Sequence, residues 1–350
     1  MAYTAIDKST DYFVTNLWTG NNTAQTITGI PFAPSFVWIK NRSTAESHTL
    51  VNTAVGANNF LKSNATSGNN TNSEFLKSFT SDGYTLGSAD EVNNGSNNIV
   101  GWNWKGGTTS GIATNGTTTI TPSAYSFDQT SGFSVIKYTG NGVDGAYLPH
   151  GLGVSPQVMI VKRSTDDGYD WYMYHVALGN QKYMQLNTAN GVSGTDGMWG
   201  SFTPTSVNMK MSNDAQIGVS SKDYVMYCFA QKQGFSRCNS YIGNGNADGT
   251  FVFTGFSPAV VIMKNVTNGS TPWLIWDNKR PGYNLTNLRL RPNTTDAEDT
   301  STADPIDFLS NGFKCRGSND DSNKAGSTFM YIAFAESPFV SSTGIPTTAR

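Results

Sequence analysis

A seven-residue segment occurs three times in this chain of 350 residues, and an internal repeat constrains the possible folds more than any other feature. The copies read PSFVWIK, PQVMIVK and PAVVIMK and span residues 34–40, 156–162 and 258–264. Both alternating faces of each copy are apolar, which is typical of a strand covered on both sides at the centre of a sheet. The leading proline fits a strand start. We expect the closing lysines, Lys40, Lys162 and Lys264, to mark the point where the strand reaches water.

Four further patterns accompany each copy in the same order. An aromatic turn signal precedes it: WTGNN (18–22), YTGNG (138–142) and YIGNG (241–245). Two patterns follow it: FLKSNAT (60–66), YMQLNTA (183–189) and LRLRPNT (288–294), then SFTSDGYTLGS (78–88), SFTPTSVNMKMS (201–212) and DFLSNGFKCRGS (307–318). An aromatic strand closes each unit: IVGWNW (99–104), YVMYCF (224–229) and FMYIAF (329–334). We therefore interpret the chain as three copies of one module.

Every shared pattern predicts a strand or a turn, because the SDG and SNG segments signal tight turns and no helical period of useful length is present. The predicted fold class is all-β, with three tandem β-sandwich modules of the jelly-roll, concanavalin-like type. The first repeat covers residues 1–106, the second 126–232 and the third 233–350. Residues 107–125 form a polar, glycine-rich linker. The joint between the second and third repeats is much shorter, so we expect these two to pack closely.

Composition supports a β-rich protein, since charged residues make up 14% and aromatic residues 12% of the chain. The formal net charge is −2 and basic residues are not clustered, which argues against a nucleic-acid partner. Three cysteines without metal-type spacing predict no disulfide framework, and Cys228 fits a small buried hydrophobe. We expect neither a secretory signal nor a membrane-inserted segment, and therefore synthesis in a cytoplasm.

Comparison of the three copies also bears on catalysis. The positions that they share hold apolar residues, glycine, proline, asparagine and one lysine, and none holds Asp, Glu, His or Cys. Residues of these types build strands, turns and a core. We therefore predict a protein that is not an enzyme, with no catalytic residues and no cofactor. A triad of His150 or His175 with Ser131 and Asp170 lacks any local signature. We interpret His48, His150 and His175 as ordinary loop or strand-edge histidines.

Acidic groups could serve glycoside hydrolysis, which needs two nearby carboxylates. Candidates are Asp166–Asp167 with Asp170, then Asp296, Glu298 and Asp299, then Asp320–Asp321. They lie in polar stretches that are typical of solvated turns. The segment NDDSN (319–323) resembles part of a calcium loop but lacks its glycine and terminal glutamate, so we predict no metal site.

Aromatic residues are the remaining candidates for ligand binding, because exposed rings on a β-sandwich can stack on sugars. The candidate glycan-stacking residues alternate along strands in the second and third repeats: Trp171, Tyr172, Tyr174, Trp273 and Trp276. One face of each such strand must be core. A glycan site would use the outward members of this set.

The pattern STDYF, LWTG, GIPFAPSFVWIKNRSTAESH, SFTSDGYTLGS and VGWNWK resembles a repeat found in virion structural proteins of tailed phages. It is most familiar from marine phages, including those of cyanobacteria, and is often labelled tail-fibre-like. The segments PHGLG (149–153), GNGNADGTFVFTGFSPA (243–259) and MYIAFAESPFVSSTGIPTTAR (330–350) are similar as well. The resemblance implies a virion component with lectin-like jelly-roll modules and no known catalytic residues. Unlike long fibres, this chain shows no heptads or shaft-like repeats.

These observations lead to an expected function and two alternatives. We expect a virion surface protein that serves host attachment as a short tail fibre or adhesin. A head decoration or tail-adaptor protein that stabilises the particle is the first alternative, and a polysaccharide depolymerase is the lesser one. Expected partners are other virion proteins, namely tail or capsid subunits, with a host surface glycan as a further candidate. A homo-oligomer is expected too, and a trimer would fit a threefold position.

Overall fold

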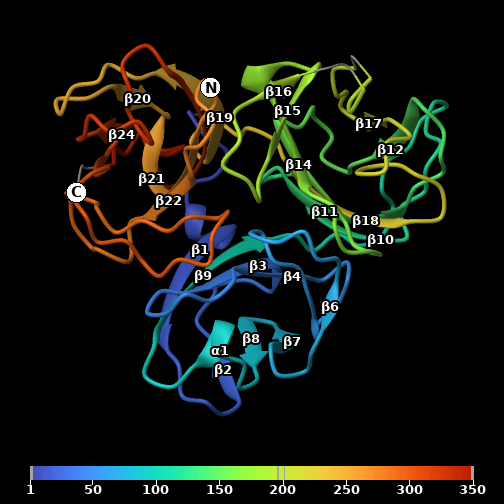
Figure 1. Cartoon of the computed structure of the whole chain (residues 1–350), viewed down its shortest axis with the longest axis horizontal. Coiled ribbons are helices and arrows are strands. Elements are labelled where there is room, and N and C mark those ends of the chain that lie inside the picture. The colour runs from blue at the N-terminus through green and yellow to red at the C-terminus, as the bar shows by residue number, and fades with distance from the viewer. Residues whose placement is uncertain (1–2, 195–196, 201, 348–350) are drawn as a thin grey trace.

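The computed structural model describes residues 3–194, 197–200 and 202–347, and it is nearly all β, as predicted. Figure 1 shows three lobes around a common centre: blue to cyan below, green to yellow at the upper right, orange to red at the upper left. Helical structure in the described residues is limited to single turns: η1 (Ser9–Asp11), α1 (Asp90–Asn93) and η2 (Val176–Leu178). Within these residues, no helix has the length and apolar character that crossing a membrane requires.

The first repeat forms a four-stranded antiparallel sheet with the order β1-β9-β3-β4. Its strands are β1 (Phe13–Thr19), β3 (Pro34–Asn41), β4 (Thr49–Asn52) and β9 (Asn98–Lys105). A smaller sheet has the order β2-β8-β7, from β2 (Gln25–Ile27), β7 (Leu76–Thr80) and β8 (Gly83–Leu86). A short pair joins β5 (Asn59–Phe60) to β6 (Asn70–Thr71).

The second repeat forms a seven-stranded sheet with the order β10-β11-β18-β13-β14-β15-β16. Its strands are β10 (Ala124–Asp128), β11 (Phe133–Thr139), β13 (Val158–Arg163), β14 (Trp171–His175), β15 (Lys182–Gln185), β16 (Ser193–Gly194) and β18 (Asp223–Phe229). A separate pair joins β12 (Ala146–Pro149) to β17 (Asn208–Met211).

The third repeat returns to four strands with the order β19-β25-β21-β22. Its strands are β19 (Ser236–Ile242), β21 (Phe256–Asn265), β22 (Trp273–Asp277) and β25 (Thr328–Pro338). The smaller sheet has the order β20-β24-β23, from β20 (Phe251–Phe253), β23 (Ile306–Leu309) and β24 (Gly312–Cys315). The same strand order occurs in all three repeats. The strand that carries the aromatic turn signal comes first, followed by the closing aromatic strand, the recurring core strand and the strand after it in sequence. These orders are β1-β9-β3-β4, β11-β18-β13-β14 and β19-β25-β21-β22.

The recurring core segment forms β3, β13 and β21, and every residue of these three strands is buried. Each lies between two antiparallel neighbours, which confirms the prediction of a central strand covered on both faces. The expectation for the closing lysines is wrong, because Lys40, Lys162 and Lys264 are all 0% exposed. Their ammonium groups donate to protein oxygens instead, such as the Thr66 carbonyl at 3.0 Å from Lys162 Nζ. The strand therefore ends beneath a covering loop rather than in water.

The two faces of each central sheet pack into different hydrophobic cores. One face, with Val37, Ile39 and Ile99, packs against the smaller sheet of its own lobe. The opposite face meets the other two lobes in one cluster of buried side chains. This common core draws from all three repeats: Phe36, Trp38, Trp102, Trp104, Ile160, Trp171, Tyr227, Phe229, Ile262, Ile332 and Phe334. A small cavity of about 20 Å³ remains at its centre, with a wholly apolar lining. The repeats therefore share a core, which a set of separate sandwiches would lack.

The Thr-Gly-Asn and Ile-Gly-Asn turns have a common cause in backbone packing. A Cβ added to Gly20, Gly140 or Gly243 would lie 1.9–2.3 Å from a backbone carbonyl oxygen of the loop beside it. Two residues further on, Asn22, Gly142 and Gly245 adopt φ of 60°, 72° and 66°, the left-handed region. The repeated motif thus combines one close backbone approach with one left-handed turn residue.

Substituting Gly243 with alanine is expected to lower the free energy of unfolding by about 1–3 kcal/mol, because the added methyl group must displace backbone. Gly116→Ala is the matched control, since no atom lies within 4 Å of the added Cβ there. Urea denaturation of both variants measures the difference. Equal stability of the two variants would show that the turn tolerates a side chain.

Candidate functional site

The five aromatic candidates from the sequence all lie in the core. Exposed fractions are 0% for Trp171, 7% for Tyr172, 3% for Tyr174, 1% for Trp273 and 0% for Trp276. This corrects the expectation that outward members of the set stack on sugars, because none offers a ring face to solvent. The strands that carry them, β14 and β22, are covered on both faces: by their own lobe on one side and by the common core on the other.

Trp171 and Trp273 instead connect neighbouring repeats. Trp171 Nε1 donates to the Lys62 carbonyl of the first repeat at 3.0 Å, and Trp273 Nε1 donates to the Gln185 carbonyl of the second repeat at 3.0 Å. At the corresponding position of the first repeat, His48 Nε2 lies 3.1 Å from the Arg291 carbonyl of the third repeat. His48 Nδ1 accepts from Trp38 Nε1 at 2.9 Å, so the ring proton is on Nε2. One hydrogen bond thus recurs at all three joints and closes a ring.

The recurring asparagines position these three donors. Asn64 Oδ1 accepts from the backbone N–H of His48, as Asn187 does from Trp171 and Asn293 from Trp273, at 2.9–3.0 Å. These asparagines belong to the recurring patterns FLKSNAT (60–66), YMQLNTA (183–189) and LRLRPNT (288–294). Each holds the start of β4, β14 or β22 next to the loop that the neighbouring repeat contacts.

A second recurring contact uses the far ends of β4, β14 and β22. Asn52 Nδ2 donates to the Tyr227 hydroxyl at 2.9 Å, from the first repeat to the second. His175 Nε2 lies 3.2 Å from the Tyr331 carbonyl of the third repeat. Trp102 Nε1 of the first repeat donates to Asp277 Oδ2 of the third at 3.1 Å. These contacts also run around the whole ring.

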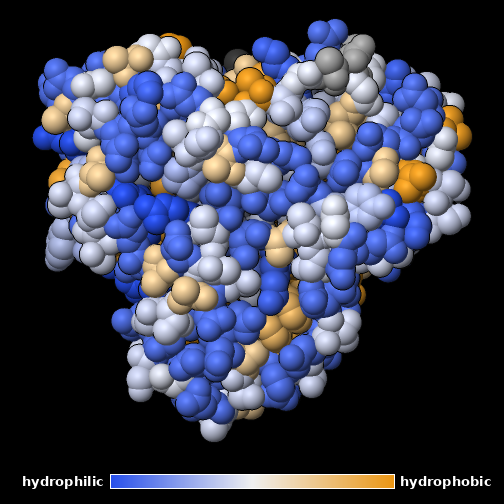
Figure 2. Space-filling view, in the orientation of Figure 1, coloured by the Kyte–Doolittle hydropathy of each residue, from blue (hydrophilic) through white to orange (hydrophobic). Residues whose placement is uncertain are grey.

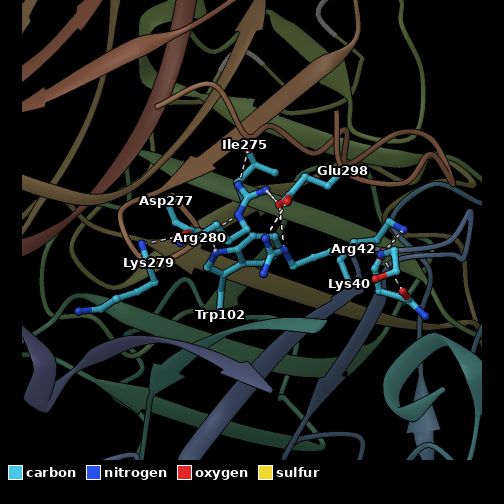
Figure 3. Close-up of polar contacts among 10 residues, drawn as sticks. Lys40, Arg42, Trp102, Ile275, Asp277, Lys279, Arg280 and Glu298 are labelled. Carbon is cyan, nitrogen blue, oxygen red and sulfur yellow. Dashed lines mark hydrogen bonds and ion pairs between the residues drawn. The ribbon is translucent and has the colours of Figure 1, made fainter. Parts of the chain in front are cut away.

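The joint between the third and first repeats holds a buried charge cluster (Figure 3). Arg280 Nε donates to Asp277 Oδ2 at 2.7 Å and its Nη1 donates to Glu298 Oε2 at 2.8 Å. Arg42 of the first repeat reaches the same Glu298 through two hydrogen bonds, at 2.7 and 2.9 Å. Asp277 and Arg280 side chains are fully buried and Glu298 is 10% exposed. This corrects the interpretation of Glu298 as a solvated turn residue, because ring closure places it between two arginines.

Several other acidic candidates are also held by partners. Hydrogen bonds from Arg163 and Lys222 lower the pKa of Asp166, which disfavours it as a proton donor. Asp170 accepts from Gln185 and Asn187 at 2.7 Å each. Arg289 and Arg291 both donate to Asp299 Oδ2, at 2.8 and 2.7 Å. In the part of the chain that the structure describes, no group of three or more His, Cys, Asp or Glu could hold a metal ion.

His48 and His150 lie in loops and His175 ends β14, as expected, and all three side chains are completely buried. Burial lowers the pKa of His150 and His175 to about 4 each, and that of His48 well below its ordinary value. His150 Nε2 lies 3.0 Å from the Thr205 carbonyl, so the structure does not assemble it with Ser131 and Asp170. The three cysteines are free and buried, in agreement with the sequence interpretation.

A surface groove follows the short joint between the second and third repeats. Two adjoining hollows of about 600 Å³ each share Lys232 and Gln233, and a third of about 300 Å³ extends along β19. One wall carries Gln157 and Val176 of the second repeat. The opposite side carries the start of β19 and the N-terminal segment 3–6. Hollows of this size fall in the usual range of ligand pockets.

Apolar side chains flank this groove. Val154 and Val176 are each 42% exposed and Phe253 is 47% exposed. Figure 2 shows apolar residues gathered at the top of the molecule between the two upper lobes, where Figure 1 places the N-terminus and β19. One signal for this site was overlooked in the sequence: the amide-rich joint QKQ (231–233), which breaks the pattern of the other repeats.

The fold defines an all-β protein in which three repeated sheets enclose one core. The chain belongs to the family described as a domain of unknown function, DUF7483, whose match covers residues 8–338. That range runs through all three repeats. No curated protein and no solved structure matches the chain.

Proposed function

We propose that this chain is a structural protein of the phage virion surface, without enzymatic activity, and that it serves host attachment as a short tail fibre or adhesin. In the finer description of the fold, each repeat is a β-sandwich of jelly-roll type. The resemblance to tailed-phage structural repeats suggests this class of protein. The observation that carries the proposal is the closed ring, in which the recurring polar residues bind the neighbouring repeat.

Such a ring suits a protein that presents surfaces outside the cell. The joints bury His48 and His175, which are therefore withheld from any substrate. Loops and grooves on the outside of the lobes are left for binding. Other virion proteins are the proposed partners on one side and a host surface glycan on the other.

A head decoration or tail-adaptor protein is the second candidate, and the arrangement of the lobes favours it specifically. Three similar sheets around one centre match a threefold position of a capsid or tail. One chain already supplies three sheets, and the proposed homotrimer would be a further level of assembly. Particles that lack the protein would then be more fragile.

Adsorption measurements separate the two candidates. The purified chain, labelled with a fluorophore, is expected to bind host cells saturably and to reduce phage adsorption when added in excess. Heat-unfolded chain is the control. Absence of cell binding at saturating concentrations, together with normal infection, would eliminate attachment and favour decoration.

A further inference from the structure

The groove between the second and third repeats has an unusual balance of charge. Among the described residues that line its three hollows, two are basic, Lys232 and Arg237, and none is acidic. The whole chain has a net charge of −2, so composition does not explain this local excess. Burial lowers the pKa of Lys232, and the Asp128 carboxylate partly offsets this by raising it. Asp128 Oδ1 itself accepts from the Ser131 N–H at 2.7 Å.

Arg237 supplies a positive charge to the third hollow. Its guanidinium carbon lies 5.8 Å from the centroid of the Phe253 ring, within the range of a cation–π contact. A side-chain hydrogen bond with Tyr331 also holds it in place. A guanidinium is always charged and only donates hydrogen bonds, so Arg237 favours an anion in this part of the groove.

Uncharged polar groups provide the rest of the lining. Gln231 and Gln233 are exposed, and within the described residues their side-chain amides form no hydrogen bond. Each amide offers donors and an acceptor, which is the combination that sugar hydroxyls require. Tyr3 lies beside them, its hydroxyl fixed by a 2.8 Å bond to the Gly255 carbonyl. Fixed aromatic rings and free amides next to apolar valines suit a saccharide ring with one polar edge and one apolar face.

We propose that this groove binds a carboxylate-bearing saccharide, in which Lys232 and Arg237 pair with the carboxylate and Gln231 and Gln233 bind hydroxyl groups. Two cations are too few for a polyanion such as nucleic acid, whose binding depends on many phosphate contacts. The inference rests on the proposed function in attachment, since bacterial surface polysaccharides are the accessible source of such sugars.

Titration calorimetry with defined oligosaccharides tests the inference. The probes are uronic-acid and sialic-acid oligosaccharides, their carboxyl-reduced counterparts, and inorganic phosphate. The full chain is expected to bind at least one acidic oligosaccharide and to bind its reduced form about tenfold or more weakly, because the charge-assisted contacts with Lys232 and Arg237 are lost. Lys232→Gln and Arg237→Gln are expected to weaken binding by a similar factor. Lys182→Gln, an exposed lysine on β15 outside the groove, is the matched control and should bind like the unaltered chain.

Circular dichroism and a second variant show whether weaker binding results from loss of the fold. Gln231→Ala with Gln233→Ala changes exposed side chains only and should weaken binding without altering the melting temperature. Equal affinity for acidic and reduced oligosaccharides, or binding to phosphate alone, would overturn the proposed ligand. If the unaltered chain binds host cells and the groove variants bind them equally well, the groove inference fails and the attachment function stands. If the chain binds neither cells nor oligosaccharides, both proposals fail.

Discussion

Replacing Asp277 with asparagine will lower the free energy of unfolding by about 3–5 kcal/mol, the usual cost of removing one charge from a buried pair. Asp277 accepts hydrogen bonds from Trp102 Nε1 and Arg280 Nε, and both its own side chain and that of Arg280 are fully buried. The substitution leaves the Arg280 guanidinium with Glu298 as its one remaining carboxylate partner. Because Trp102 belongs to the first repeat and Asp277 to the third, the loss weakens the closure of the ring.

Urea denaturation followed by tryptophan fluorescence measures this effect. Asp320→Asn is the control, since Asp320 is 55% exposed and pairs with Lys324 on the surface, where an ion pair contributes about 1 kcal/mol or less. A double variant, Asp277→Asn with Arg280→Met, should recover part of the loss because it no longer leaves a buried cation underbonded. If Asp277→Asn and Asp320→Asn are equally mild, the cluster does not stabilise the closed ring.

Acid will destabilise the chain between about pH 6.5 and 4, before most carboxylates are protonated. The ordinary histidine pKa of 6.5 falls to about 4 for His150 and His175 in the folded state. Between these values the unfolded chain binds more protons than the folded chain, so falling pH favours unfolding. A shift of this size corresponds to about 3 kcal/mol per histidine at 1.36 kcal/mol per unit. His48 acts in the same direction.

The test is the slope of unfolding free energy against pH, measured from pH 7 to 5. His150→Gln and His175→Gln should each flatten this slope, whatever they do to stability at pH 7, because each removes one proton taken up on unfolding. Glu46 and Asp304, whose pKa is raised by burial, act in the opposite direction and are unchanged in these variants. A slope that is the same in all three proteins would contradict burial of neutral histidines.

Local patterns in the sequence predicted the strands well. The segment at residues 34–40 carries apolar residues on both faces, and β3 is buried along its whole length. The SDG and SNG signals also correspond to hairpins, β7–β8 and β23–β24. These features depend on side-chain alternation and turn geometry within a few residues, which the sequence displays directly.

Contacts between repeats could not be predicted in the same way. Arg42 and Glu298 are 256 positions apart, and nothing in their local sequence pairs them. Lys162 ends an apolar strand, which suggests water, yet Thr66 of another repeat caps it. Trp171 alternates along a strand like a candidate binding residue, but its ring lies at a joint. In each case the partner comes from closure of the ring, a property of three repeats together.

Location of the protein on purified particles is the most direct measurement of the central claim, that this chain is an exterior virion protein. Antibody against the chain, visualised by immunogold electron microscopy of intact virions, is expected to label the tail end. Label over the head would support the decoration candidate instead. Absence of label, with the protein missing from purified particles by mass spectrometry, would contradict the account.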